Sequence, residues 1–125
     1  MKRIAVVNDD TIFLDMMVAV LEEFGCEAVA YREGDKAFQQ LQADPPDLIV
    51  LDIRMEKPET GWTLVELLTL DKTLRHIPVI VCSAAVFDLR AHADWLEQNG
   101  IDVLPKPFNV DQLHEKVMLA LNELH

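Results

Sequence analysis

The chain has 125 residues, half of them hydrophobic and 26% charged, which is the composition of one globular domain. It carries 11 Lys and Arg against 22 Asp and Glu, a formal net charge of −11. This charge argues against binding to nucleic acid or to an anionic membrane surface. It fits a soluble, cytoplasmic protein in which most of the excess acid lies on the solvated surface, and basic partners or bound cations are a second interpretation. We therefore expect one folded domain over residues 1–125, with no second domain attached.

The cysteine content and the lack of a predicted targeting segment are also consistent with a cytoplasmic protein. Cys26 and Cys82 are too few for a disulfide framework or a metal motif, and both lie among apolar residues, so we expect buried free thiols. The apolar run near the N-terminus ends at Asn8 and is too short for a signal peptide. No segment approaches the ~20 apolar residues of a membrane-spanning helix.

Short apolar runs alternate with longer amphipathic segments along the chain. The runs are of strand length and rich in Val and Ile, and they cover residues 4–7, 28–31, 48–51, 79–82 and 101–104. The segments between them have helical periodicity, and they cover residues 12–24, 34–43, 62–71, 86–98 and 110–124. Gly25 is placed to end the first helix and Asn109 to cap the last.

Five strand–helix pairs in alternation predict a parallel sheet with helices on both faces. The first, third and fourth runs are unbroken, as expected for strands that are covered on both faces. The second strand starts with Glu27, and the fifth contains Asp102 and Pro105, which favours positions at the edges of the sheet. The predicted fold is therefore an α/β, flavodoxin-like (βα)5 three-layer sandwich with strand order 2-1-3-4-5.

Polar side chains gather where the predicted strands end. In chain order they are Asn8, Asp9, Asp10, Asp52, Ser83 and Lys106. Because the carboxyl ends of parallel strands share one edge of the sheet, we expect them around one crevice. Asp52 carries most weight, since a carboxylate after four large apolar residues needs a partner. Asp10 has a second interpretation, because acidic residues also favour the N-terminus of a helix.

The chemistry of this set points to a cation and a phosphoryl group. Carboxylates with few nitrogen or sulfur donors suit Mg²⁺ or Mn²⁺ better than Zn²⁺. A carboxylate beside such a cation can attack phosphorus. The transferred group needs positive charge and hydrogen-bond donors around its oxygens, which the cation, Lys106 and Ser83 would supply. The residues therefore indicate phosphoryl transfer onto Asp52.

These residues also carry a resemblance to a known family. The chain resembles the receiver domains of bacterial two-component response regulators, of the single-domain chemotaxis-regulator type. The resemblance covers essentially the whole chain, and four segments in the correct order carry it: 7–10, 47–55, 78–84 and 106–108. It implies a stand-alone receiver, which catalyses only its own phosphorylation and dephosphorylation and is not an enzyme acting on another substrate.

The resemblance further implies the partners and the metal ligands. A histidine kinase or a histidine phosphotransfer protein would donate the phosphoryl group to Asp52, and phosphorylation would switch binding of an unidentified downstream protein. Mg²⁺ would be bound by Asp9, by the Asp52 carboxylate and by the backbone carbonyl of Arg54.

The remaining implied roles concern the phosphoryl group and the output face. Ser83 and Lys106 would bind the phosphoryl oxygens, and the peptide bond between Lys106 and Pro107 would be cis. The helix at 86–98, the fifth strand and the last helix would form the face that meets the partner or a second copy of the chain.

Several positions depart from the family pattern. Asn8 replaces the first acid of the usual pair, and it can still orient a metal-bound water, so we expect weaker Mg²⁺ binding. The loop at 55–61 is one residue longer than usual. Val103 stands where many members have an aromatic switch residue. Arg54, two residues after the acceptor, has two interpretations: it reaches over the site or it points into solvent.

Two alternatives remain. Asn8 and Val103 are also consistent with a receiver-like binding module that no longer depends on phosphorylation. An enzyme on the same architecture is disfavoured, because no glycine-rich phosphate loop follows the first strand. The D-x-D motif of aspartate-nucleophile phosphatases is also missing there.

Overall fold

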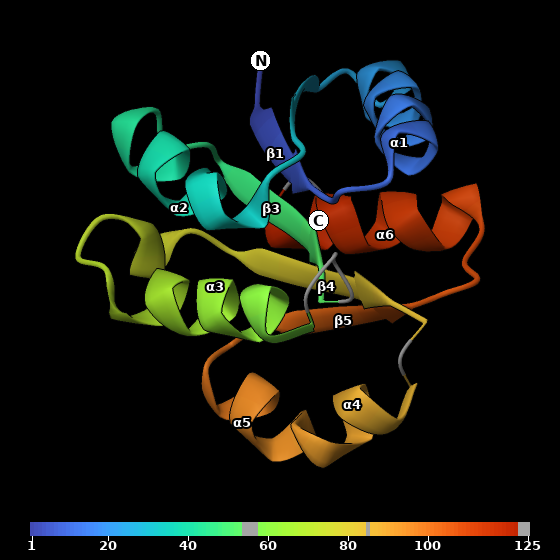
Figure 1. Ribbon diagram of the computed structural model, residues 1–125. Coiled ribbons are helices and arrows are strands. Elements are labelled where there is room, and N and C mark those ends of the chain that lie inside the picture. The colour runs from blue at the N-terminus through green and yellow to red at the C-terminus, as the bar shows by residue number, and fades with distance from the viewer. Residues whose placement is uncertain (54–57, 85, 123–125) are drawn as a thin grey trace.

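The structure is a computed structural model that describes residues 1–53, 58–84 and 86–122. Its sheet has five parallel strands in the order β2-β1-β3-β4-β5 (Figure 1). Their bounds are β1 Arg3–Val7, β2 Glu27–Tyr31, β3 Leu48–Asp52, β4 Val79–Ser83 and β5 Asp102–Pro105. The predicted fold class and strand order are confirmed, with β2 and β5 at the edges.

The helices connect these strands and lie on both faces of the sheet. Their bounds are α1 Thr11–Glu23, α2 Gly34–Ala43, α3 Pro58–Leu70, α4 Val86–Ala91, α5 Ala93–Gln98 and α6 Val110–Ala120, with a short 3₁₀ helix at Leu74–His76. The helix predicted at 62–71 begins earlier, at Pro58, because proline is well tolerated in a first helical turn. No helix within the described ranges is long and apolar enough to cross a membrane.

The single helix predicted at 86–98 is wrong, since the chain breaks at His92 into α4 and α5. His92 has φ −109° and ψ 10°, outside the helical region. Its ring stacks on Trp62 of α3, with centroids 3.8 Å apart and planes 24° apart. The break lets this ring lie flat against a side chain of another helix.

Successive side chains of the central strands point to opposite faces of the sheet, so the core has two layers. Ile4, Leu48 and Ile80 belong to the layer covered by α1 and α6. Their neighbours in sequence point to the other face, which α2, α3, α4 and α5 cover. Because successive strand residues point to opposite faces, Asp52 at the end of β3 shares the α1 and α6 face with Leu48. Figure 1 shows the helices on the two sides of the sheet.

The helix ends follow the expected local chemistry. Asp10 caps α1, its carboxylate accepting hydrogen bonds from the N–H groups of Ile12 and Phe13, as the helix-start interpretation predicted. Asn109 and Gln112 form a capping box at the start of α6. Gly25 follows α1 with φ +85°, a conformation that favours glycine.

Gly61 packs α3 directly against the end of β3. A Cβ atom at this position would lie 2.2 Å from the carbonyl oxygen of Ile53. Ile53 follows Asp52, so the absence of a side chain at Gly61 lets α3 approach the backbone next to the site.

Candidate functional site

An ion pair joins the ends of two strands at the carboxyl edge of the sheet. Nζ of Lys106, just beyond β5, lies 2.7 Å from Oδ2 of Asp52 at the end of β3. The Asp52 side chain is 8% exposed and that of Lys106 is 24% exposed. The carboxylate thus has the cationic partner that its burial requires.

Asn8 is a second partner of the same carboxylate oxygen. Its Nδ2 donates a hydrogen bond of 3.3 Å to Oδ2 of Asp52. Its Oδ1 accepts a 2.9 Å bond from the backbone N–H of Asp10, and the residue is 1% exposed. The amide is therefore held from both ends, and it presents a neutral donor to Asp52 instead of a second negative charge.

Ser83 is buried at the end of β4, beside the segment that carries the lysine. Its carbonyl oxygen accepts a 2.9 Å hydrogen bond from the backbone N–H of Lys106. The Lys106–Pro107 peptide bond is cis. The backbone of β4 thereby holds the lysine segment next to Ser83 and Asp52.

Asp9 follows Asn8 and is exposed at the edge of the site. Arg54, whose backbone carbonyl is the expected metal ligand, lies outside the described residues. So do residues 55–57 of the long loop. The structure therefore brings together Asn8, Asp52 and Lys106 by direct contacts, with Ser83 joined through its backbone.

Phe13 lies beside Lys106, a contact that the sequence did not predict, since it placed this residue only in the amphipathic segment 12–24. Nζ of Lys106 lies 4.0 Å from the centroid of the Phe13 ring. That ring and the ring of Phe108 form a T-shaped pair, with centroids 6.4 Å apart and planes 86° apart. The only signal in the sequence was an aromatic residue in the first turn after the acidic segment.

The donor set around the carboxylate is one that a hard cation accepts. Asp9 and Asp52 offer carboxylate oxygens, which Mg²⁺ and Mn²⁺ prefer, whereas the amide oxygen of Asn8 already accepts from the backbone N–H of Asp10. No group of three or more His, Cys, Asp or Glu residues able to hold a metal occurs in the described part of the chain. Any cation here would therefore need backbone carbonyls or water to complete its coordination, and Mg²⁺ usually keeps several waters.

Cys82 lies beside Asp52 in the sheet register and is fully buried. Burial raises the pKa of its thiol to about 12, and the nearby Lys106 only partly offsets this. Both cysteines are buried and neither forms a disulfide, as predicted. A buried protonated thiol is a poor nucleophile and a poor metal ligand, so Cys82 contributes packing to the site and no chemistry.

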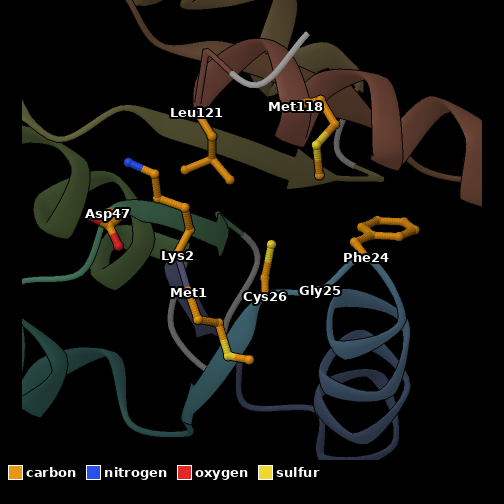
Figure 2. Close-up of a pocket in the computed structure, with 8 residues that line it drawn as sticks. All are labelled: Met1, Lys2, Phe24, Gly25, Cys26, Asp47, Met118 and Leu121. Atoms are coloured by element: carbon orange, nitrogen blue, oxygen red, sulfur yellow. The ribbon is translucent and has the colours of Figure 1, made fainter.

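A cavity of about 540 Å³ lies at the opposite edge of the sheet (Figure 2). Phe24, Met118 and Leu121 line it together with Lys2 and Cys26. It is formed at the amino ends of β1 and β2, far from the ends that carry Asn8 and Asp52. The predicted phosphoryl-transfer site therefore lies at the other end of the strands and is separate from this cavity.

A second hollow borders the last strand. Its volume is about 520 Å³, and Leu89, Leu96 and Val103 are among the residues that line it, on α4, α5 and β5. Val103 is half-buried and packs against the core layer on that face. Val103 thus forms part of the lining of this groove.

Comparisons with known proteins agree with this geometry. Residues 4–118 match the family model of the response regulator receiver domain. The polar-differentiation response regulator DivK of Brucella ovis is 29% identical over 124 residues, which are 98% of each chain. The signal receiver domain of a signal transduction histidine kinase from Syntrophus aciditrophicus is 30% identical, with a TM-score of 0.84 over 99% of this chain and 92% of that one.

A third relative resembles this chain in fold. The receiver domain of a sensor histidine kinase from Pseudomonas aeruginosa, whose structure has magnesium coordinated in the active-site cleft, gives a TM-score of 0.82 at 21% identity. The match covers 97% of this chain and 98% of that one.

Proposed function

Because the chain belongs to the response regulator receiver domain family, we propose that it works in two-component signalling by accepting a phosphoryl group on Asp52. The observation that carries the proposal is the 2.7 Å contact between Lys106 Nζ and the buried Asp52 carboxylate. The lysine ammonium lies beside the carboxylate oxygen that would attack phosphorus, where it can also bind the phosphoryl oxygens.

The reaction uses the side chains in distinct ways. An Asp52 carboxylate oxygen attacks phosphorus, the bond from phosphorus to the donor breaks, and the donor leaves with the bonding electrons. The product is an aspartyl phosphate, in which the phosphoryl group carries about two negative charges beside Asp9, in place of the single charge of the carboxylate. Lys106 and the Ser83 hydroxyl then bind phosphoryl oxygens, which places positive charge and a donor where negative charge develops.

Magnesium would supply the remaining positive charge. Asp9, Asp52 and the carbonyl of Arg54 would hold it, and Asn8 would contribute through a water molecule. The magnesium-containing receiver domain from Pseudomonas aeruginosa supports this assignment by its fold. Asn8 removes one negative charge from the usual acidic pair, so the affinity for Mg²⁺ is lower than with two acids.

An apolar surface beside the site suits a phosphodonor protein. Ile12 is 82% exposed and Met16 is 42% exposed, one turn apart on α1, and Val110 at the start of α6 is 52% exposed. The contact of Phe13 with Phe108 brings these two helices together next to Lys106. Exposed apolar side chains in such a patch mark an interaction surface, and we assign it to a histidine kinase or histidine phosphotransfer protein.

The groove along α4, α5 and β5 is the proposed output face. A downstream protein or a second copy of the chain would bind there after phosphorylation. The alternative is that this face binds its partner whether or not Asp52 is modified. The two possibilities differ in the effect of Asp52→Asn on partner binding. Binding that depends on phosphorylation no longer responds to the phosphodonor in this variant, whereas binding that does not depend on phosphorylation is unchanged.

Intact-mass measurement tests the acceptor. The protein is incubated with Mg²⁺ and acetyl phosphate, and wild type is expected to gain one phosphoryl group in an acid-stable, base-labile adduct. Asp52→Asn keeps the size of the side chain and one oxygen that can accept from Lys106 and Asn8, so it should fold and gain nothing. Leaving out Mg²⁺ should slow the reaction strongly.

Two results would contradict the proposal: no adduct on the wild-type protein, or an equal adduct on Asp52→Asn. Docking is tested separately with Ile12→Lys, which should react normally with acetyl phosphate but slowly with a phosphohistidine protein.

A further inference from the structure

Lys106 is held in place by more than its ion pair. Its ammonium group lies 2.7 Å from Asp52 Oδ2 and 4.0 Å from the centroid of the Phe13 ring. The lysine side chain is 24% exposed, so solvent competes with both contacts. The aromatic ring therefore covers part of the surface through which the lysine could otherwise turn toward water.

The ring itself is fixed. The backbone N–H of Phe13 donates to the capping carboxylate of Asp10, with a distance of 3.3 Å, which holds the first turn of α1. The ring packs edge to face on Phe108, and both side chains are part of the core layer under α1 and α6. A ring anchored in this way presents its negative face to a cation without needing to reorganise.

We propose that Phe13 is a positioning residue of the phosphoryl site, whose ring face keeps the ammonium group of Lys106 over Asp52 before the phosphoryl group arrives. The inference rests on the proposed function of Asp52 and adds a residue to it. A cation that is already in place stabilises the developing charge at no cost in reorganisation. In a site where Asn8 has replaced an acid, the lysine has one carboxylate fewer to hold it, so the ring matters more.

Three substitutions separate positioning from packing. Phe13→Leu keeps an apolar side chain but removes the ring face. Phe13→Tyr restores the face and serves as the rescue. Phe24→Leu is the matched control, because Phe24 lies at the other end of α1 in the same core layer, where its ring contacts His114 at 4.7 Å.

The first readout is the NMR signal of the Lys106 side chain in the unphosphorylated protein. Protons above a ring face are shielded, so the Lys106 Hε signals should lie upfield in wild type and in Phe13→Tyr. They should move downfield in Phe13→Leu and stay unchanged in Phe24→Leu.

The second readout is the rate constant of phosphorylation by acetyl phosphate with Mg²⁺. Phe13→Leu should lower it about two- to fivefold, the size of a partly exposed cation–π contact. Phe13→Tyr and Phe24→Leu should remain near the wild-type rate. If the Lys106 Hε chemical shifts are the same in Phe13→Leu as in wild type, or if this variant is phosphorylated at the wild-type rate, the positioning role alone is overturned. No phosphorylation of the wild-type protein would overturn the acceptor and the positioning role together.

Discussion

Replacing Gly61 with Ala should destabilise the protein, although alanine is the better helix former. A Cβ at Gly61 would lie 2.2 Å from the oxygen and 2.7 Å from the carbon of the Ile53 carbonyl. Both atoms belong to the backbone, so no side-chain rotation relieves the contact. The end of β3 and the start of α3 must therefore move apart.

The magnitude follows from two opposing effects. Alanine in place of glycine inside a helix gains about 1 kcal/mol. Forcing an extra methyl group into a packed position costs typically 1–3 kcal/mol, and a contact with fixed backbone atoms belongs at the upper end of that range. We expect a net loss of about 1–2 kcal/mol in the free energy of unfolding.

Urea unfolding followed by far-UV circular dichroism measures this loss. With a typical urea m-value for a small domain, the midpoint should fall by roughly 0.5–1 M. The control is Thr63→Ala, an exposed position in the same helix that changes helix propensity without the backbone contact. A Gly61→Ala midpoint equal to or above wild type would show that α3 does not approach Ile53 closely and would refute the reasoning.

Three further predictions follow from the site and from one surface carboxylate. Cys82 should not react with a thiol reagent at pH 8 in the native protein, because burial raises its pKa to about 12, and should react once urea unfolds the chain. Hydrogen bonds from the Gln42 side chain and the backbone N–H of Leu74 lower the pKa of Asp71. The ionised Asp71 carboxylate therefore stabilises the fold at neutral pH, and this stabilisation is lost as the pH falls through its folded-state pKa. An NMR titration of Asp71 should show a midpoint that is higher in Gln42→Ala than in wild type. Asn8→Asp should tighten Mg²⁺ binding several-fold in a tryptophan fluorescence titration, since it adds a negative ligand.

The strands and the strand order were predictable because they depend on local patterns. Unbroken apolar runs identify strands buried on both faces, and Glu27, Asp102 and Pro105 mark the two edges. The same holds for caps, where Asp10 and Asn109 act within their own turn. In each case the residues that decide the structure lie within a few positions of one another in sequence.

The missed features depend on contacts between distant segments. The break at His92 accompanies its stacking on Trp62, thirty positions earlier, and the helical period of the segment does not reveal it. The position of Phe13 over Lys106 depends likewise on how α1 packs beside the segment after β5. An apolar residue in the stripe of an amphipathic helix is predicted to pack in the core. Phe13 does pack against the core, and its ring also contacts the ammonium group of Lys106.

The candidate site was predictable in part. The sheet topology brings Asn8, Asp52, Ser83 and Lys106 to one edge, as the positions of these residues at strand ends predicted. The sequence did not predict that the Asn8 amide would donate to Asp52, because Asn8 had been expected to act through a metal-bound water. An amide has both a donor and an acceptor, and only the local geometry decides which one faces the carboxylate.

Locating the phosphoryl group on the chain tests the central claim most directly. The protein is phosphorylated with acetyl phosphate and Mg²⁺ and treated at once with borohydride, which reduces an acyl phosphate to an alcohol, and its peptides are then analysed by mass spectrometry. We predict a single reduced residue, homoserine at position 52. Reduction at Asp9 or Asp10 with Asp52 intact, or no reduced residue at all, would contradict the assignment of Asp52 as the phosphoacceptor.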